Sequence, residues 1–391
     1  MSRVEPRRRG GKRAARPPSR RRVRRTEHSA EPSPTPSLEP APRAPSASSS
    51  PPRVCEPVPE SGKAPGAADR RHRLGVIAWL LVVLASAAVL VLGLAGHVGT
   101  WVADVGAVAA STAYTWGLAA RTGGRPVLFS VFTLLLGALV VAVDSDSLRS
   151  GAAVVTAVLA AVFAVMATVP AVHFAGAIRE TVVALVIAAI GAMATLAWAP
   201  VVNLLRFEYT VLALSFVAAF VMVYRLGAGF HGLGTRGVLT VVLGGVMLAL
   251  TLGYAELLRR YGTADLVQTL DDAVRWSHHH LGAFPRPIIA LLGVPALTWG
   301  THMRARRRQG WWVCAFGVAV TAPVAYGLVD PGRSVLEVSL AAAYGGLIGL
   351  VLGYLLIRAD LRLTGPRGRR LKETEEVTAV RPEPGRTHAL W

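Results

Sequence analysis

Long apolar runs follow one another from residue 75 to residue 357 of this chain. Ten of them are nearly free of charge, and a helix needs roughly 20 residues to cross a hydrocarbon core of about 30 Å. The expected spans are residues 75–96, 102–120, 127–143, 152–174, 181–201, 209–224, 238–255, 288–302, 311–329 and 336–357. The sixth and eighth runs are short for a span, so nine to eleven spans are possible. The pattern predicts an all-α, polytopic transmembrane helix bundle of about ten spans.

A different periodicity occupies residues 259–286, between the seventh and eighth expected spans. Apolar positions recur there at helical spacing, with Thr263 placed to cap a helix and Gly282 to end it. They are Leu266, Leu270, Ala273, Val274 and Leu281, with Ser277 on the same side. We expect an amphipathic helix at about residues 264–281, lying on the outer surface of the membrane.

The last expected span carries small residues at intervals of four. These are Ala341, Gly345, Gly349 and Gly353. Small residues let two helix backbones approach closely within a bilayer. We therefore predict that this stripe packs against another helix of the same chain, with a dimer contact as the alternative.

Composition supports a membrane protein rather than a soluble one. Hydrophobic residues make up 52% of the 391 positions, and the mean hydropathy is +0.45. The chain has two cysteines, Cys55 in the amino-terminal tail and Cys314 inside an apolar run. Such a pair is too few for a disulfide framework or a cysteine-based metal site.

The formal net charge of +19 lies mostly in the two tails. Residues 1–73 are rich in Arg, Pro and Ser and poor in apolar side chains, which predicts a disordered basic cytoplasmic tail. Residues 359–391 form a second tail, which is also expected to be disordered and cytoplasmic. Arginines near the first span could bind anionic lipid headgroups, or could only fix the topology. We expect no nucleic-acid partner, because the tail has no stacking aromatic residues.

Lys and Arg also predict the orientation, because positively charged loops stay in the cytoplasm. With the amino terminus inside, the inner loops carry Arg121, Arg179, Arg225 and Arg304, and an even number of spans returns the basic carboxyl tail to the same side. We expect a multi-pass protein of the cell membrane with both termini cytoplasmic.

Five acidic residues at the outer ends of the spans are the candidate catalytic residues. They are Asp104, Glu208, Glu256, Asp330 and Glu337. If they converge, they could act as general acid and base, or bind a divalent cation. Alternatively, they carry charge where helices meet water.

A metal site is a weaker hypothesis. His278, in a run of three histidines, shares a helical face with Asp271. Consecutive helical residues point about 100° apart and cannot all bind one tetrahedral ion. We expect no metal and no cofactor, and a solvated helix face is the alternative.

Prolines break several spans, and broken helices can expose carbonyls to a polar substrate. Thr168 precedes Pro170 in the fourth span, and Thr321 precedes Pro323 in the ninth, where an inverted repeat of five plus five would place them. A glycine-rich basic loop at residues 225–236 could hold a phosphate, or be a simple turn.

These features favour a transporter or permease-like bundle for a small or lipidic substrate. The first alternative is a membrane-embedded enzyme acting on an envelope or lipid substrate at the outer face, and the second is a non-catalytic scaffold. A polar cavity at the membrane midplane would favour transport, whereas convergent acids in an outward groove would favour an enzyme. The sequence leaves the oligomeric state open.

Overall fold

The computed structural model describes residues 67–96, 99–225, 234–307, 309–364 and 383–390. Residues 1–66 and the loop residues 226–233 lie outside this part, and with them most of the amino-terminal tail and of the glycine-rich loop. Throughout the described residues the regular structure is helical, with no strand. The expected all-α bundle is confirmed.

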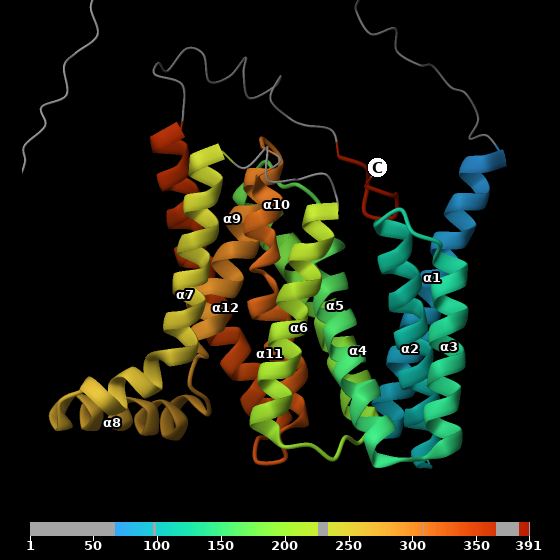
Figure 1. Cartoon of the computed structure of the whole chain (residues 1–391), viewed down its shortest axis with the longest axis horizontal. Helices are drawn as coiled ribbons and strands as arrows, with labels where there is room; N and C mark the ends of the chain where they lie inside the picture. The colour runs from blue at the N-terminus through green and yellow to red at the C-terminus, as the bar shows by residue number, and fades with distance from the viewer. Residues whose placement is uncertain (1–66, 97–98, 226–233, 308, 365–382, 391) are drawn as a thin grey trace, which may run out of the picture. The chain divides into compact units, whose positions relative to one another are not determined.

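The helices follow the apolar runs of the sequence (Figure 1). They are α1 (Ala67–Leu94), α2 (Thr100–Arg121), α3 (Pro126–Val143), α4 (Asp146–Met166), α5 (Phe174–Ala197), α6 (Leu204–Arg225), α7 (Gly234–Tyr261), α8 (Ala264–Leu281), η2 (Ile288–Gly293), α9 (Val294–Arg304), α10 (Gly310–Ala315), α11 (Val318–Val329) and α12 (Val335–Thr364).

Within the described residues, eight helical segments are long and apolar enough to cross a membrane. They correspond to eight of the ten expected spans. The second expected span corresponds to α2, which has 22 residues but carries Asp104 and Arg121. The eighth corresponds to η2 and α9, which have 6 and 11 residues and are each too short to span a membrane alone. The number of about ten spans therefore stays a prediction.

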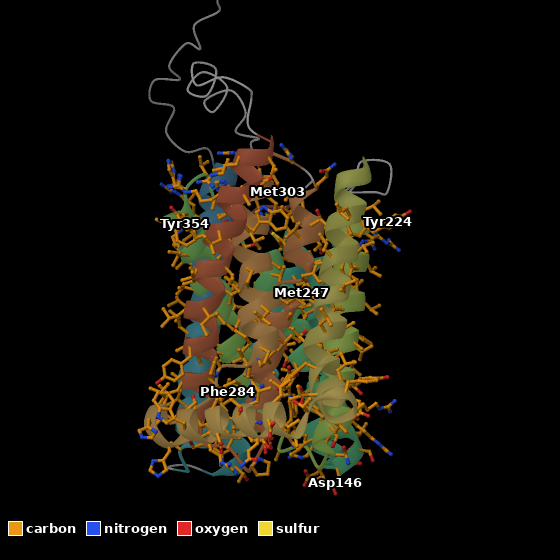
Figure 2. The ribbon with its side chains drawn as sticks, turned by 90° about the vertical axis from the view of Figure 1, so that its left-hand side faces the viewer. Asp146, Tyr224, Met247, Phe284, Met303 and Tyr354 are labelled. Atoms are coloured by element: carbon orange, nitrogen blue, oxygen red, sulfur yellow. The ribbon has the colours of Figure 1, made fainter. Side chains whose placement is uncertain are left out.

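The surface of the bundle is apolar where a membrane would surround it. Leu, Val and Phe side chains on α1, α3, α7 and α12 are exposed, and α3 has no buried residue. Figure 2 shows nitrogen and oxygen atoms gathered toward the two ends, with Tyr354 near one end and Asp146 at the other. Such a wide exposed apolar surface indicates a lipid environment.

The segment Gly310–Val329, which comprises α10 and α11, forms the centre of the bundle, and nearly all of its residues are buried. Helix α11 is packed against α4, α5, α6, η2 and α12. Small residues make the close approach possible: a Cβ added at Gly191 of α5 would overlap the side chain of Ala160 on α4. In a bilayer, packing of this kind replaces the hydrophobic force that acts in water.

The glycine stripe of α12 faces η2 and α9. A Cβ added at Gly349 would lie 2.6 Å from Val294 Cβ, and one at Gly345 would lie 3.0 Å from Ile289 Cγ2. Gly353 meets Thr298 in the same way, and Ala341 is buried. The structure thus places the stripe against helices of the same chain.

The fourth and fifth spans differ from the expected boundaries. Residues 152–174 were expected to form one run, but α4 ends at Met166 and α5 begins at Phe174. Pro170 explains the break, because proline has no N–H to donate and disfavours helix at the residue before it. The resulting loop, residues 167–173, is central to the site described below.

The tails also differ from the simple expectation of free coils. Helix α1 begins at Ala67 and α12 continues to Thr364, so both helices extend into the expected tails. Near the end of the chain, Glu383–Leu390 lies against the bundle beside α2 (Figure 1). We call these eight residues the carboxyl-terminal segment.

Helix α8 has the bounds that its periodicity predicts. Gly282 ends it with a left-handed φ of +76°, which glycine adopts without strain. Thr263 stands at the cap position but makes no side-chain cap bond. The helix projects sideways from the bundle, at the end away from the carboxyl-terminal segment, and its apolar residues Leu266 and Leu270 are exposed (Figure 1). Its position on a membrane surface stays a prediction.

Candidate functional sites at the two ends of the bundle

A polar network surrounds the end of α4, where the helix leaves its last carbonyls without helical partners. Three arginines from distant parts of the chain donate to these carbonyls. Arg121 Nε bonds Met166 O at 3.2 Å, Arg386 Nε bonds Ala167 O at 3.0 Å, and Arg304 Nη2 bonds Thr168 O at 3.1 Å. The break after α4 thus leaves several carbonyl oxygens free of helical partners, and arginine side chains donate hydrogen bonds to them.

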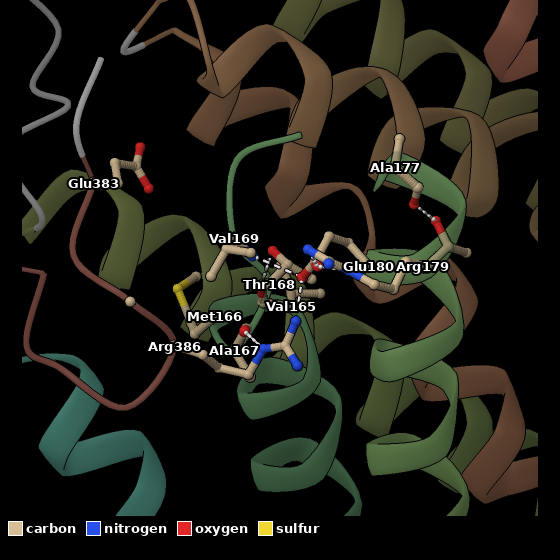
Figure 3. A network of polar contacts seen from close by, with 12 residues as sticks. Val165, Met166, Ala167, Thr168, Val169, Ala177, Arg179, Glu180, Glu383 and Arg386 are labelled. Carbon is tan, nitrogen blue, oxygen red and sulfur yellow. Dashed lines mark hydrogen bonds and ion pairs between the residues drawn. The ribbon is translucent and has the colours of Figure 1, made fainter. Parts of the chain in front are cut away.

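Glu180 is the fixed acid of this network and is fully buried. Its Oε2 accepts hydrogen bonds from Val169 N at 2.9 Å and from Arg386 Nη2 at 2.6 Å. Its Oε1 accepts one from Arg179 Nε at 3.1 Å (Figure 3). A buried carboxylate is tolerated only when it is paired and hydrogen-bonded, and Glu180 meets both conditions.

Two buried arginines face the carboxyl-terminal segment. Arg304 is 0% exposed, and its Nη2 lies 2.7 Å from Glu383 Oε2, while its Nη1 bonds Thr168 Oγ1 at 2.8 Å. The guanidinium also stacks on Trp311, with 3.4 Å between Cζ and the ring centroid. Arg304 therefore bonds to fixed residues of the bundle on one side and to the segment on the other.

Arg121 is 2% exposed and binds the backbone of the segment. Its Nη1 donates to the carbonyls of Pro384, Gly385 and His388, at 3.2, 2.7 and 2.9 Å. In return, Leu390 N donates to the Arg121 carbonyl at 3.0 Å. The segment is bound as a peptide ligand would be, through both its backbone and its side chains.

A second site is a cavity of about 240 Å³ near the opposite end of the bundle. Two of the five expected acids, Glu208 of α6 and Asp330 after α11, line it together with Arg286, Tyr326 and Arg333. Asp330 and Arg333 form an ion pair of 3.2 Å. Positive and negative groups thus share one small cavity, and its remaining walls come from α6, α7 and the start of η2.

Arg286 is one of the two arginines that line this cavity. Its Nη1 donates to Pro323 O at 3.2 Å, and its Cζ lies 5.4 Å from the ring centroid of Tyr326. Desolvation by burial lowers the pKa of Arg286 below its ordinary value, with the neighbouring Arg333 acting in the same direction. The nearby Glu208 and Asp330 act oppositely, by favouring the charged form.

The other three expected acids do not line this cavity. Asp104 makes a two-point ion pair with Arg149 of α4, at 2.9 and 3.0 Å. Glu256 is exposed and pairs with Arg260 at 2.7 Å, and Glu337 lies in the first turn of α12. The structure thus brings together two of the five.

His278 and Asp271 are both exposed on α8. Across the described part of the chain, no three His, Cys, Asp or Glu side chains are placed to hold one metal ion. The neighbouring charges pair along the helix instead, as Asp272 does with Arg275.

The sequence places Arg121 and Arg304 in expected inner loops, and nothing in their local pattern indicates that their side chains are buried. Pro170 and the acid Glu180 were visible signals of an unusual helix break. No local pattern, however, links them to Glu383, about 200 residues later in the chain. Comparison with protein-family models, with curated proteins and with solved structures found no match to this chain.

Proposed function

We propose that this multi-pass helical protein is a permease-like transporter for a small or lipidic substrate with a charged polar group. The observation that carries the proposal is one interrupted helical segment, Ile288–Arg304, which joins the two polar sites. Arg286, which lines the cavity, precedes Ile288 by two residues. Arg304 of the polar network at the other end is the last residue of the segment.

The irregularity of this segment supports a functional role. It begins with the π-helix η2 and then carries Pro295 in the first turn of α9. Wide turns of this kind are rare and frequently occur at functional sites. Transporters place substrate sites at discontinuous helices, whose neighbours satisfy the freed backbone groups.

The cavity lined by Arg286 and Glu208 indicates the chemistry of the substrate. Arg286 and Arg333 would bind a phosphate or carboxylate, and Glu208 and Asp330 would bind an amine. A cavity of about 240 Å³ is smaller than typical drug-sized pockets of roughly 300–1,000 Å³. It suits a zwitterionic head group rather than a whole lipid, whose chains would remain in the membrane.

A lipid-flipping assay tests this proposal. The purified protein is reconstituted into vesicles that contain phosphatidylethanolamine with a fluorescent acyl chain, and dithionite then bleaches the lipid of the outer leaflet. We expect the bleached fraction to exceed that of protein-free vesicles, and Arg286→Gln to reduce this excess. Arg260→Gln is the matched control, because Arg260 is an exposed arginine of α7 that pairs with Glu256 outside the cavity. Equal bleaching with and without protein would reject lipid transport.

A membrane-embedded enzyme is the second candidate, and the meeting of Glu208 with Asp330 favours it. Tyr326 lies between charged groups of both signs in the same cavity, where it could donate or accept a proton. Mass spectrometry of a membrane-lipid extract incubated with the protein would reveal head-group conversion, and Glu208→Gln should abolish it. If the protein neither flips nor converts lipid, the scaffold hypothesis is favoured.

We also propose that the protein resides in the cell membrane with both termini in the cytoplasm. The arginine-bearing inner loops support this orientation. The carboxyl-terminal segment and the network would then face the cytoplasm, and the cavity would open outside. Anionic lipid headgroups near the basic tails remain proposed partners.

A further inference from the structure

We propose that the network at the end of α4 is a binding site for carboxylate ligands, and that the carboxyl-terminal segment is its tethered, removable occupant. In this state the Glu383 carboxylate fills the position of the ligand carboxylate on Arg304. This inference concerns binding alone and does not depend on transport.

The charges contributed by the bundle favour an anion. Without the segment, the buried charged groups here are Arg121, Arg304 and Glu180, two cations and one anion. Arg179 also contacts Glu180, but its side chain is 69% exposed. An unpaired guanidinium is costly to bury, so a site with surplus positive charge binds an anion strongly.

The contacts of the segment define what the ligand needs. One carboxylate oxygen receives the Arg304 Nη2 donor, and nearby carbonyl oxygens receive Arg121 Nη1. The Arg386 side chain adds a cation that reaches Glu180. A peptide that carries both a carboxylate and an arginine satisfies all of these groups, whereas a small free carboxylate satisfies Arg304 and leaves Glu180 without this partner.

The segment is attached in a way that permits exchange. Eighteen residues, 365–382, connect it to α12. Its contacts with the bundle are mostly polar, and Leu390 is its apolar side chain that packs against the core. Part of the segment is accessible to solvent: Thr387 and His388 are exposed, and the Arg386 side chain is 36% exposed. A competing ligand could therefore displace it without unfolding the bundle.

Peptide binding tests the inference directly. A synthetic peptide with the sequence of residues 383–391 carries a fluorescent label, and anisotropy measures its binding to detergent-purified protein. We expect saturable binding to a chain in which residues 383–391 are replaced by a Gly/Ser linker, and much weaker binding to the intact chain, whose site is occupied. A peptide with Gln in place of Glu383 should bind roughly ten- to a hundredfold more weakly, because it loses a charge-assisted bond to a buried arginine.

Competition then separates the two sources of carboxylate. Unlabelled peptide and citrate are added in turn to the replaced chain with labelled peptide bound. Displacement by citrate would identify a site open to small carboxylates, and displacement by the unlabelled peptide alone would identify a site for carboxylate-bearing peptides. Equal binding of the Glu and Gln peptides would overturn the carboxylate assignment. Failure of the replaced chain to bind either peptide, while it elutes as a single folded species, would overturn the site itself.

A measurement on the full chain covers the case in which the replaced chain does not fold. Trypsin cleavage after Arg386 reports release of the segment. We expect Glu383→Gln to accelerate this cleavage, and Glu256→Gln, an exposed acid away from the network, to leave it unchanged. Unchanged cleavage in Glu383→Gln would refute the role of this carboxylate in retention. Lipid flipping in vesicles is measured separately, so failure of either proposal leaves the other test intact.

Discussion

The packing of α12 against η2 and α9 can be tested by replacing Gly349 with leucine. A Cβ at this position would lie 2.6 Å from Val294 Cβ and 3.2 Å from Ala290 O. Carbon atoms pack at about 3.5–4.0 Å, so the two helices must separate by on the order of 1 Å. Val294 Cβ cannot move away by rotation, because it is fixed to the backbone.

The expected magnitude follows from two opposing effects. Overpacking a tight interface costs about 1–3 kcal/mol, and leucine is larger than the single carbon used in the geometry above. Replacing glycine within a helix favours the variant by about 1 kcal/mol. The cost of separating the helices should exceed the gain in helix propensity, because Gly345 and Gly353 pack on the same side and would lose their contacts with η2 and α9 as well. With the upper end of the overpacking cost, the net loss is about 2 kcal/mol, so we expect Gly349→Leu to lower the apparent Tm by about 4–8 °C, at roughly 2–4 °C for each kcal/mol.

The matched control is Gly346→Leu. Gly346 is in the same helix, but no atom lies within 4 Å of an added Cβ, so only the favourable helix effect remains. Leu350→Ala is a second control, since Leu350 lies outside the stripe and is only partly buried. Melting of the variants is compared in one detergent by tryptophan fluorescence. If Gly349→Leu melts with the wild type, the packing argument for α12 fails.

Three further predictions concern the buried charges and the topology. Glu180→Gln should destabilise the bundle by about 1–3 kcal/mol, because it leaves Arg386 without its anion while the hydrogen bond from Val169 N is retained. Denaturant titration measures this loss, and an unchanged midpoint would show that the ion pair contributes little. Asp104→Asn should lower the Tm by a few degrees, because the buried carboxylate joins α2 to α4 through Arg149, and a melting temperature equal to the wild type would contradict it. A reporter that is active only outside the cytoplasm should be silent after Leu361 and active near Asp272, and the reverse pattern would invert the proposed topology.

Helix positions could be predicted because they depend on neighbouring residues. The length of an apolar run and its period are local properties, and α3 begins and ends within one residue of its expected bounds. For α8, helical spacing together with Thr263 and Gly282 as its boundary residues predicted both ends. The predicted bounds of the fourth span are wrong at residues 167–173, where the apolar run continues but Pro170 interrupts the helix. Apolarity alone cannot distinguish a continuous helix from a buried turn.

Only the tertiary structure decided which charged groups meet. Glu208 and Asp330 share a cavity, while Glu256 pairs within its own helix, although all three sit at helix ends in the sequence. The sequence predicts Arg304 to be a charged residue of a cytoplasmic loop. In the structure its side chain is fully buried and forms an ion pair with Glu383. Local pattern predicts where a chain is helical and where it meets lipid, because those properties extend over one or two turns. Charge pairing depends on side chains that are far apart in sequence, and only the packing of the helices brings them together.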